Sequence, residues 1–178
     1  MSGVNRPLNL QAIAQETLLR YGFLVEPPTA ALAEAARLSE PDFRHLGLKD
    51  LTGWLWSSID NDDSRDLDQV EYLLSDPHGT RLFVGIADVS SFIDRGSALD
   101  QAARHNTTSI YTGVRTFPMF PERLSTNLTS LVEGQNRLAV VVEMLVPPDG
   151  SERRRNDSTK CRTAGTSSAP ESPILAVG

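Results

Sequence analysis

An acidic stretch, DNDDSRDLDQVE at residues 60–71, limits what this chain can fold into more than any other feature. Six of its twelve residues are acidic, and Arg65 is its only basic residue. Two carboxylates about 4 Å apart repel by roughly 4 kcal/mol at an effective dielectric near 20. The chain must therefore either spread these charges over a solvated turn or gather them around a cation.

The sequence on both sides of the acidic stretch is apolar and predicts strands. LTGWLWSSI precedes it and is expected to be a strand that leads into the acidic loop. VEYLLSD and RLFVGIADVSSFI follow it, and the turn residues between them predict a hairpin. The run RLAVVVEMLV at residues 137–146 predicts a further strand.

Helices are predicted at the beginning of the chain and after the hairpin. Asn9 is a suitable cap for a helix through LQAIAQETLLRY, and Thr29 for a second helix. Ser97, with Asp100 three residues later, has the spacing of a capping box. Strands and helices are thus interspersed, which favours the α+β class. We expect a helical region at residues 1–50 and a catalytic or binding domain from residue 51.

The last part of the chain has a different composition. Residues 147–178 are rich in Ser, Thr, Arg, Gly and Pro and show neither a helical nor a strand period. Such a segment is predicted to be a disordered tail. On this prediction the strand at residues 137–146 has no strand partner after it.

Charge and composition exclude several classes of protein. The formal net charge of −6 and the isoelectric point near 5.0 argue against a general nucleic-acid binder, which usually carries a basic face. A single cysteine, Cys161, excludes an intramolecular disulfide, and we expect no disulfide-linked partner. No apolar run is long enough to cross a membrane, and the first residues show no signal sequence. We expect a cytoplasmic protein without membrane contact.

Calcium is one candidate ion for the acidic stretch. Counted from Asp60, the ligand positions of an EF-hand loop would be filled by Asp60, Asp62, Ser64, Asp66, Asp68 and Glu71. However, Arg65 stands at the sixth position, where the sharp turn needs glycine, and the flanks resemble strands rather than helices. A calcium-binding loop therefore stays only as a minor alternative.

Magnesium is the second candidate ion, since it prefers oxygen ligands and needs only one or two carboxylates beside a substrate phosphate. Asp66 and Asp68 project to the same side if their segment is extended. Asp60 would lie about 20 Å from Asp66 in a straight chain, so a turn within NDDSR must fold it back. A solvated acidic turn without any ion is the competing interpretation.

Five segments in order resemble the RNB family of exoribonucleases between about residues 54 and 146. They are SIDNDDSRDLDQ, LFVGIADVSSFI, GSALDQAARHNTTSIY, FPMFPERLSTNLTSL and NRLAVVVEM. The resemblance implies hydrolysis of single-stranded RNA from its 3′ end, with Mg²⁺ or Mn²⁺, to nucleoside 5′-monophosphates. It also implies that Asp60, Asp66 and Asp68 bind metal and act in catalysis, and that Tyr111 stacks on a base.

The chain departs from the family pattern in two ways. The fourth metal-binding aspartate is replaced by Gln69, for which Asp62 or Asp63 would have to compensate, whereas we expect Glu71 to face solvent. Asp88 is a candidate either for support of the metal loop or for a cap on the following turn. This departure leaves a second interpretation open, an RNA-binding module without turnover.

The second departure is length. The family's catalytic domain continues beyond residue 146, so the resemblance implies a truncated domain at residues 51–146. We therefore predict that residues 147–178 are not family sequence.

Overall fold

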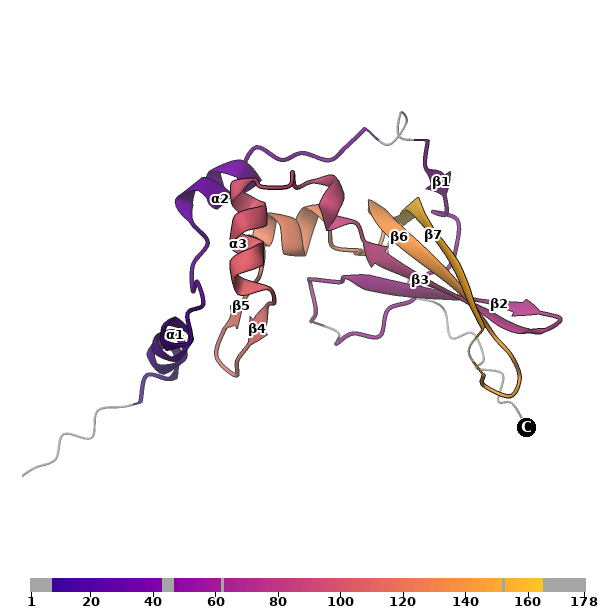
Figure 1. Ribbon diagram of the computed structural model, residues 1–178, viewed down its shortest axis with the longest axis horizontal. Coiled ribbons are helices and arrows are strands. Elements are labelled where there is room, and N and C mark those ends of the chain that lie inside the picture. The colour runs from indigo at the N-terminus through magenta and orange to yellow at the C-terminus, as the bar shows by residue number, and fades with distance from the viewer. Residues whose placement is uncertain (1–7, 43–46, 62, 152, 165–178) are drawn as a thin grey trace, which may run out of the picture. The chain divides into compact units, whose positions relative to one another are not determined.

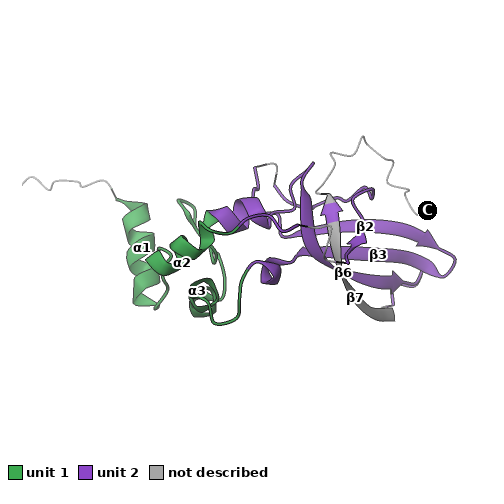
Figure 2. Ribbon diagram, turned by 90° about the horizontal axis from the view of Figure 1, so that it is seen from above, with its two compact units in different colours: residues 1–38, 93–122 green, residues 39–92, 123–178 purple. Residues whose placement is uncertain are grey.

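A computed structural model describes residues 8–42, 47–61, 63–151 and 153–164, and the chain forms two compact units (Figure 2). The first unit combines residues 1–38 with 93–122, and the second combines residues 39–92 with 123–178. Each unit is therefore built from two separate stretches of the chain, which differs from the predicted division at residues 50 and 146. Helices and antiparallel strands are both present, as expected for an α+β protein.

The first helix of the first unit, α1, spans Leu10–Arg20 and confirms the predicted helix (Figure 1). The Asn9 side chain accepts a hydrogen bond from the Ala12 backbone N–H at 3.0 Å. This bond satisfies one of the four N–H groups that a helix start leaves without a partner in the helix. The helix ends at Arg20, and Gly22 follows two residues later with a φ of +83°, which suits a residue without a side chain.

Two further helices, α2 at Thr29–Ala35 and α3 at Ala98–Asn106, lie in the same unit. Glu34, at the end of α2, accepts a hydrogen bond from the Leu99 backbone N–H at the start of α3, at 3.1 Å. The predicted cap of α3 is confirmed, because Ser97 Oγ accepts a hydrogen bond from the backbone N–H three residues later at 3.3 Å. The bond from Leu99 to Glu34 joins α3 to α2, and the Ser97 bond caps α3 itself.

A two-stranded sheet completes the first unit. Its strands are β4 at Ile110–Tyr111 and β5 at Thr116–Phe117, paired antiparallel. Arg115 precedes β5 and forms an ion pair with Glu26 at 2.7 Å, so the hairpin is tied to the segment between α1 and α2.

The second unit is built on a five-stranded sheet with the strand order β1-β7-β6-β3-β2 (Figure 1). The strands are β1 (Lys49–Asp50), β2 (Gln69–Asp76), β3 (Gly79–Ala87), β6 (Asn136–Val146) and β7 (Arg153–Ala164). Two short helical turns, η2 (Val89–Ser91) and η3 (Arg123–Leu128), lie between β3 and β6 in the chain.

The predicted hairpin after the acidic stretch is confirmed as β2 and β3, which pair antiparallel along their whole length. Its turn reaches Gly79, which has a φ of +143°. A Cβ atom at this position would overlap the carbonyl oxygen of Val146 on β6. Only glycine therefore allows the turn and the neighbouring strand to approach so closely.

The prediction of a disordered tail is wrong for residues 153–164. These residues form β7, which pairs antiparallel with β6 on one side and parallel with β1 on the other. The strand at residues 136–146 therefore does have a partner after it, and backbone pairing rather than an apolar pattern makes β7 a strand. Residues 165–178 lie outside the described residues.

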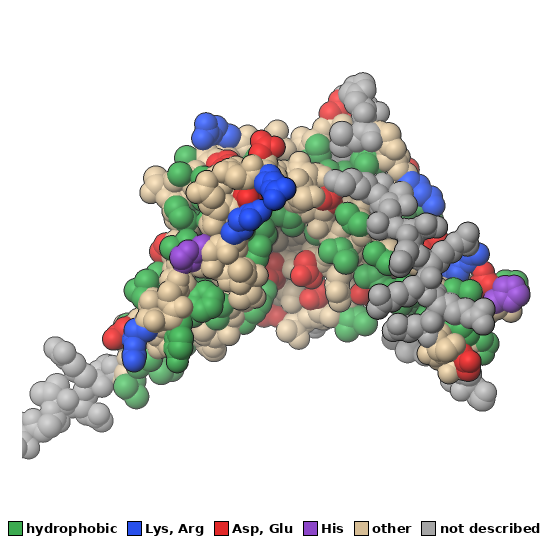
Figure 3. Space-filling model, viewed as in Figure 1, with side chains coloured by type: hydrophobic (Ala, Val, Ile, Leu, Met, Phe, Trp, Pro, Cys, Tyr) green, Lys and Arg blue, Asp and Glu red, His purple; other side chains and the backbone are tan. Residues whose placement is uncertain are grey.

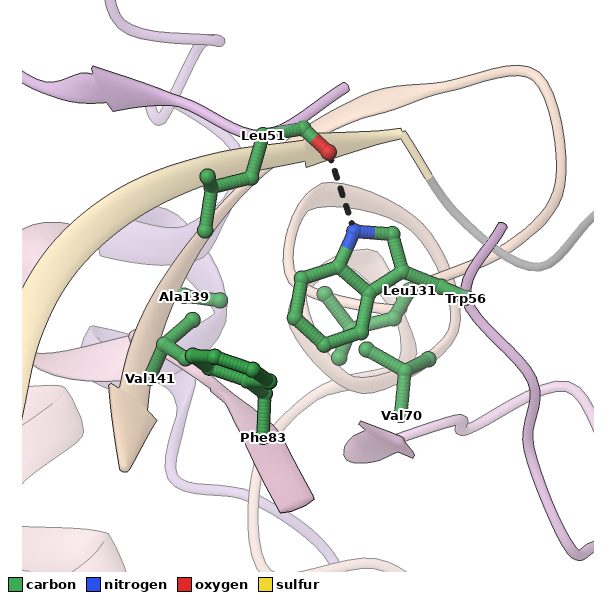
Figure 4. Close-up of a cluster of buried hydrophobic side chains, with 7 residues drawn as sticks. All are labelled: Leu51, Trp56, Val70, Phe83, Leu131, Ala139 and Val141. Carbon is green, nitrogen blue, oxygen red and sulfur yellow. Dashed lines mark hydrogen bonds between the residues drawn. The ribbon is translucent and has the colours of Figure 1, made fainter. Parts of the chain in front are cut away.

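The prediction of a strand in LTGWLWSSI is also wrong. Residues 51–58 are irregular apart from an isolated antiparallel bridge between Ser57 and Glu71. The apolar side chains of this segment nevertheless enter the core. Trp56 is 1% exposed, and its indole Nε1–H donates a hydrogen bond to the Leu51 carbonyl at 3.0 Å (Figure 4).

The core of the second unit lies on one face of the sheet. Its buried members are Leu51, Trp56, Val70, Phe83, Leu131, Ala139 and Val141 (Figure 4). Gly85 is paired with both Val70 and Val141, and a Cβ there would lie 3.1 Å from Val70 Cγ2 and 3.6 Å from the Trp56 ring. The absence of a side chain at residue 85 thus leaves room for the indole.

Large apolar side chains also reach the surface, where Figure 3 draws apolar atoms in green. Exposed examples on β2 and β3 are Leu73, Leu74 and Ile86. Among the described residues, no helix has the length and apolar character that crossing a membrane requires.

Candidate metal and RNA site

A closed loop carries the acidic stretch. The bridge between Ser57 and Glu71 is made by two backbone hydrogen bonds, of 2.9 and 2.7 Å. Because the bridge is antiparallel, Asp60 and Asp68 each lie three residues inside it, on opposite arms of the loop. The chain therefore reverses direction between Asp60 and Asp68, as the turn expected within NDDSR requires.

The return is made by a turn at residues 61–64. The Ser64 backbone N–H donates to the Asn61 carbonyl at 2.9 Å. Asp63 is exposed at this turn, and Asp62 lies outside the described residues. The role of both in compensating for Gln69 stays a prediction.

The backbone on both sides of Asp66 is fixed by hydrogen bonds from the segment before β6. Ser130 Oγ donates to the Arg65 carbonyl at 2.6 Å and accepts from the Leu67 backbone N–H at 3.0 Å. The Leu131 backbone N–H donates to the Leu67 carbonyl at 2.8 Å. Asp66 itself is half-buried.

Asp68 comes directly before β2, and its side chain is exposed. Its carbonyl accepts a hydrogen bond from the Ala87 backbone N–H at the end of β3, at 2.9 Å. Asp66 and Asp68 therefore project from a segment whose backbone is attached to two different parts of the fold. Sequence alone did not indicate these attachments.

Asp60 and Glu71 lie on opposite arms of the loop and interact electrostatically. Asp60 is exposed and accepts a hydrogen bond from the Ser58 hydroxyl. Burial, and secondarily the negative charge of Asp60, raise the pKa of Glu71 above its usual value. Among the described residues, Glu71 Oε2 is a buried oxygen without a hydrogen-bond partner.

The expectation that Glu71 faces solvent is therefore wrong, since the residue is half-buried and lies near Asp60. The bridge pairs Ser57 with the backbone of Glu71, and no local pattern in the sequence indicated that bridge. The sequence contains only a weak indication that Glu71 belongs to the acidic loop, namely that it is the sixth carboxylate of the stretch.

Gln69 and Asp88 both lie at the open end of the β2–β3 hairpin, opposite its turn. Gln69 is the exposed first residue of β2, paired with Ile86. Asp88 is 4% exposed, and its carboxylate accepts hydrogen bonds from Ser90 Oγ at 2.5 Å and from Ser91 Oγ at 2.6 Å. Asp88 stands at the N-cap position of η2, but its carboxylate bonds these two hydroxyls and makes no side-chain cap bond to the turn's backbone. Support of the metal loop stays a prediction.

Tyr111 belongs to the first unit, whereas the aspartates belong to the second. It is the second residue of β4, and its side chain is 66% exposed. The phenol ring is thus accessible to a planar ligand. Its stacking on a base stays a prediction.

The aspartates fit a magnesium site by the type of their donor atoms. Carboxylate oxygens are the ligands that Mg²⁺ prefers. Within the described part of the chain, no three or more His, Cys, Asp or Glu side chains are close enough together to hold a metal ion. The structure therefore does not gather Asp60, Asp66 and Asp68 into one group of three. Their role as metal ligands stays a prediction that rests on donor chemistry and on the resemblance to the RNB family.

The local structure does not favour a calcium-binding EF-hand. That motif places its loop between two helices. Here the irregular segment 51–58 precedes the acidic loop and strand β2 follows it.

Comparison with protein families identifies the class to which this fold and acidic loop belong. The family model described as the RNB domain matches residues 48–161, which is more than half of the chain. The chain therefore belongs to the RNB family. The match continues past residue 146, so the prediction that family sequence stops there is wrong.

Among curated proteins, ribonuclease R of Thermotoga maritima is similar to this chain. The two are 41% identical over 130 residues, which is 70% of this chain and 18% of the relative. The chain thus spans about a fifth of the length of this relative.

Solved structures show the same fold. Mycoplasma genitalium RNase R in complex with ribose-methylated single-stranded RNA matches with a TM-score of 0.80 and 30% identity. The match covers 88% of this chain and 24% of that chain. Yeast Ssd1, a pseudonuclease, matches with a TM-score of 0.54 and 15% identity over 72% of this chain and 16% of that chain, which shows similarity of fold alone.

Proposed function

We propose that this chain forms part of the catalytic domain of a 3′-to-5′ exoribonuclease that hydrolyses single-stranded RNA to nucleoside 5′-monophosphates. The observation that carries the proposal is the arrangement of Asp66 and Asp68. They lie two residues apart on a segment whose backbone is held on both sides. The resemblance of SIDNDDSRDLDQ to the acidic motif of the RNB family implies that both bind metal. The similarity to ribonuclease R supports RNA as the substrate.

Asp60, Asp66 and Asp68 would hold Mg²⁺, with Mn²⁺ as the other candidate ion. When bound, divalent cations supply positive charge that stabilises the attacking and leaving oxygens of a phosphodiester. The protein contributes fixed positions for the carboxylates, because the anchored backbone does not have to be ordered when RNA arrives. Asp62 and Asp63 are proposed as additional support at the turn, and Asp88 at the end of β3.

Tyr111 is proposed to hold the RNA through its ring. An aromatic side chain stacks on any base and contributes about 1–3 kcal/mol to binding without reading sequence. Its exposure of 66% is consistent with this role. Contacts of this kind suit an enzyme that degrades RNA irrespective of sequence.

An RNA-binding module without turnover is the second candidate, because Gln69 occupies the place of the fourth aspartate. A neutral amide is a weaker ligand for Mg²⁺ than a carboxylate. The fold also occurs in yeast Ssd1, a pseudonuclease. Fold alone therefore does not decide between hydrolysis and binding.

A labelled single-stranded RNA incubated with the purified chain and Mg²⁺ separates the two candidates. Progressive shortening from the 3′ end that is abolished by Asp68→Asn supports the enzyme. Asp94→Asn removes an exposed carboxylate of the first unit and should leave shortening unchanged. RNA binding without shortening, by both the chain and its Gln69→Asp variant, would contradict the enzyme and favour the binding module.

A further inference from the structure

Ser130 holds the backbone around Asp66 from both sides. Its hydroxyl donates to the Arg65 carbonyl at 2.6 Å and accepts from the Leu67 backbone N–H at 3.0 Å. One oxygen atom thus joins the residues before and after Asp66. Ser130 is 1% exposed, so water cannot readily replace this oxygen.

Ser130 is itself held by a buried cation. The Arg137 side chain is 4% exposed, and its Nε–H donates to the Ser130 carbonyl at 3.1 Å. Its Nη1 donates to Glu40 Oε1 at 3.0 Å, which offsets the buried charge. The serine is therefore a fixed point and not a freely rotating surface hydroxyl.

The neighbouring residues extend the attachment toward Asp68. The Leu131 backbone N–H donates to the Leu67 carbonyl at 2.8 Å, and the Asp68 carbonyl accepts from Ala87 at 2.9 Å. Leu67 also packs against the core of the second unit. The bonds of Leu131 and Ala87 are made between backbone groups. The Ser130 hydroxyl is a side-chain group that contacts the backbone on both sides of Asp66, so a substitution can remove its contacts.

We propose that Ser130 is a positioning residue for divalent-metal binding: its hydroxyl sets the direction in which Asp66 and Asp68 present their carboxylates. This inference rests on the proposed function, since it takes these aspartates as the metal ligands. Ser130 does not touch the metal. Without its hydroxyl, the Arg65 carbonyl and the Leu67 N–H lose their shared partner, and the segment that carries Asp66 can move.

Mn²⁺ titration followed by electron paramagnetic resonance measures metal binding without any need for activity. Ser130→Ala should weaken Mn²⁺ binding by about tenfold or more, the usual effect of removing a group that orients metal ligands. If the chain shortens RNA, the same variant should need more Mg²⁺ for half-maximal rate and recover much of the rate at saturating Mg²⁺.

Thr129→Val is the matched control. Thr129 is 5% exposed, and its hydroxyl donates to the Leu124 carbonyl at 2.9 Å, within its own segment. The control also removes a buried hydroxyl and loses stability, but its Mn²⁺ affinity should stay within about twofold of the unchanged chain, because the Leu124 carbonyl is not part of the acidic loop and the Ser130 hydroxyl is kept. Equal weakening by both variants would overturn the positioning role.

The design distinguishes failure of this inference from failure of the proposed function. Asp68→Asn is titrated first, and unchanged Mn²⁺ binding in that variant overturns the metal site and this inference together. Weaker binding with Asp68→Asn but not with Ser130→Ala overturns the inference alone.

If Ser130→Ala does not fold by circular dichroism, Ser130→Cys replaces it under the same criteria. The thiol keeps the approximate size of the side chain and makes only weak hydrogen bonds. Loss of folding in both variants, with Thr129→Val still folded, would assign Ser130 a structural role and overturn the proposal.

Discussion

Trp56 shows at the scale of one residue how an irregular segment is fixed. Its indole fills the space above Gly85 and Val70, and its N–H is satisfied by the Leu51 carbonyl. The ring centroids of Trp54 and Trp56 lie 5.6 Å apart, which is within the range of favourable aromatic pairs. Segment 51–58 is therefore held by side chains and by the single Ser57–Glu71 bridge, and not by a paired strand.

Replacing Trp56 is expected to cost much of the stability of the second unit. Trp56→Ala should lower the free energy of unfolding by about 3–5 kcal/mol, because it leaves a large cavity. Trp56→Phe should lower it by about 1–3 kcal/mol, because the buried Leu51 carbonyl loses its donor. Urea unfolding measures both changes.

Leu55→Ala is the control for these two variants, since Leu55 is 64% exposed. It should change the free energy of unfolding by no more than about 0.5 kcal/mol. A Trp56→Ala variant as stable as the Leu55→Ala variant would contradict the buried position of the indole.

Asp76 makes the stability of the hairpin turn dependent on pH. The His78 backbone N–H and the Arg81 guanidinium donate to its carboxylate at 3.0 and 2.7 Å, and these bonds lower the pKa of Asp76 below its usual value. A lowered pKa in the folded state means that the contribution to stability is present above the unfolded pKa. It is lost as the pH falls through the folded value.

Asp76→Asn should therefore lower the melting temperature at pH 7, and the difference from the unchanged chain should shrink as the pH falls below about 4. Thermal melts from pH 7 to pH 2 measure this trend. A difference in melting temperature between the two chains that stays constant from pH 7 to pH 2 would show that the ionised Asp76 carboxylate contributes nothing to stability.

At the scale of elements, β7 could not be predicted from its sequence. RRRNDSTKCRTA has no apolar alternation, and only its pairing with β6 and β1 makes it a strand. By contrast, α1, α3, β2, β3 and β6 could be predicted, because caps or apolar patterns lie within each segment. The acidic loop was also evident, but the Ser57–Glu71 bridge and the Ser130 contacts join residues far apart in sequence.

A chain that ends at residue 148 should lose the ordered sheet, because it lacks β7 and exposes the backbone of β6 at a new edge. Exposed edge strands promote aggregation. Size-exclusion chromatography and far-ultraviolet circular dichroism should show association and loss of strand signal. A chain that ends at residue 164 retains every described strand and is the control.

If the shorter chain remained monomeric and kept its strand signal, β7 would not be needed for the sheet. The family match up to residue 161 argues for the opposite outcome. Both results concern the second unit alone, since β7 pairs only with strands of that unit.

At the scale of the whole molecule, net charge and function have to be reconciled. A chain with a net charge of −6 repels RNA unless cations or a local basic surface compensate. The proposed metal site resolves this conflict, because divalent cations at the aspartates would bring positive charge to the place where a phosphate must bind. The central claim is thus that Asp60, Asp66 and Asp68 bind divalent cations together.

A crystal of the chain soaked in Mn²⁺ tests this claim most directly. The anomalous difference map should contain a peak in contact with carboxylate oxygens of at least two of the three aspartates, and Asp68→Asn should reduce it. An ordered acidic loop with its three side chains directed into solvent and no peak between them would contradict the claim.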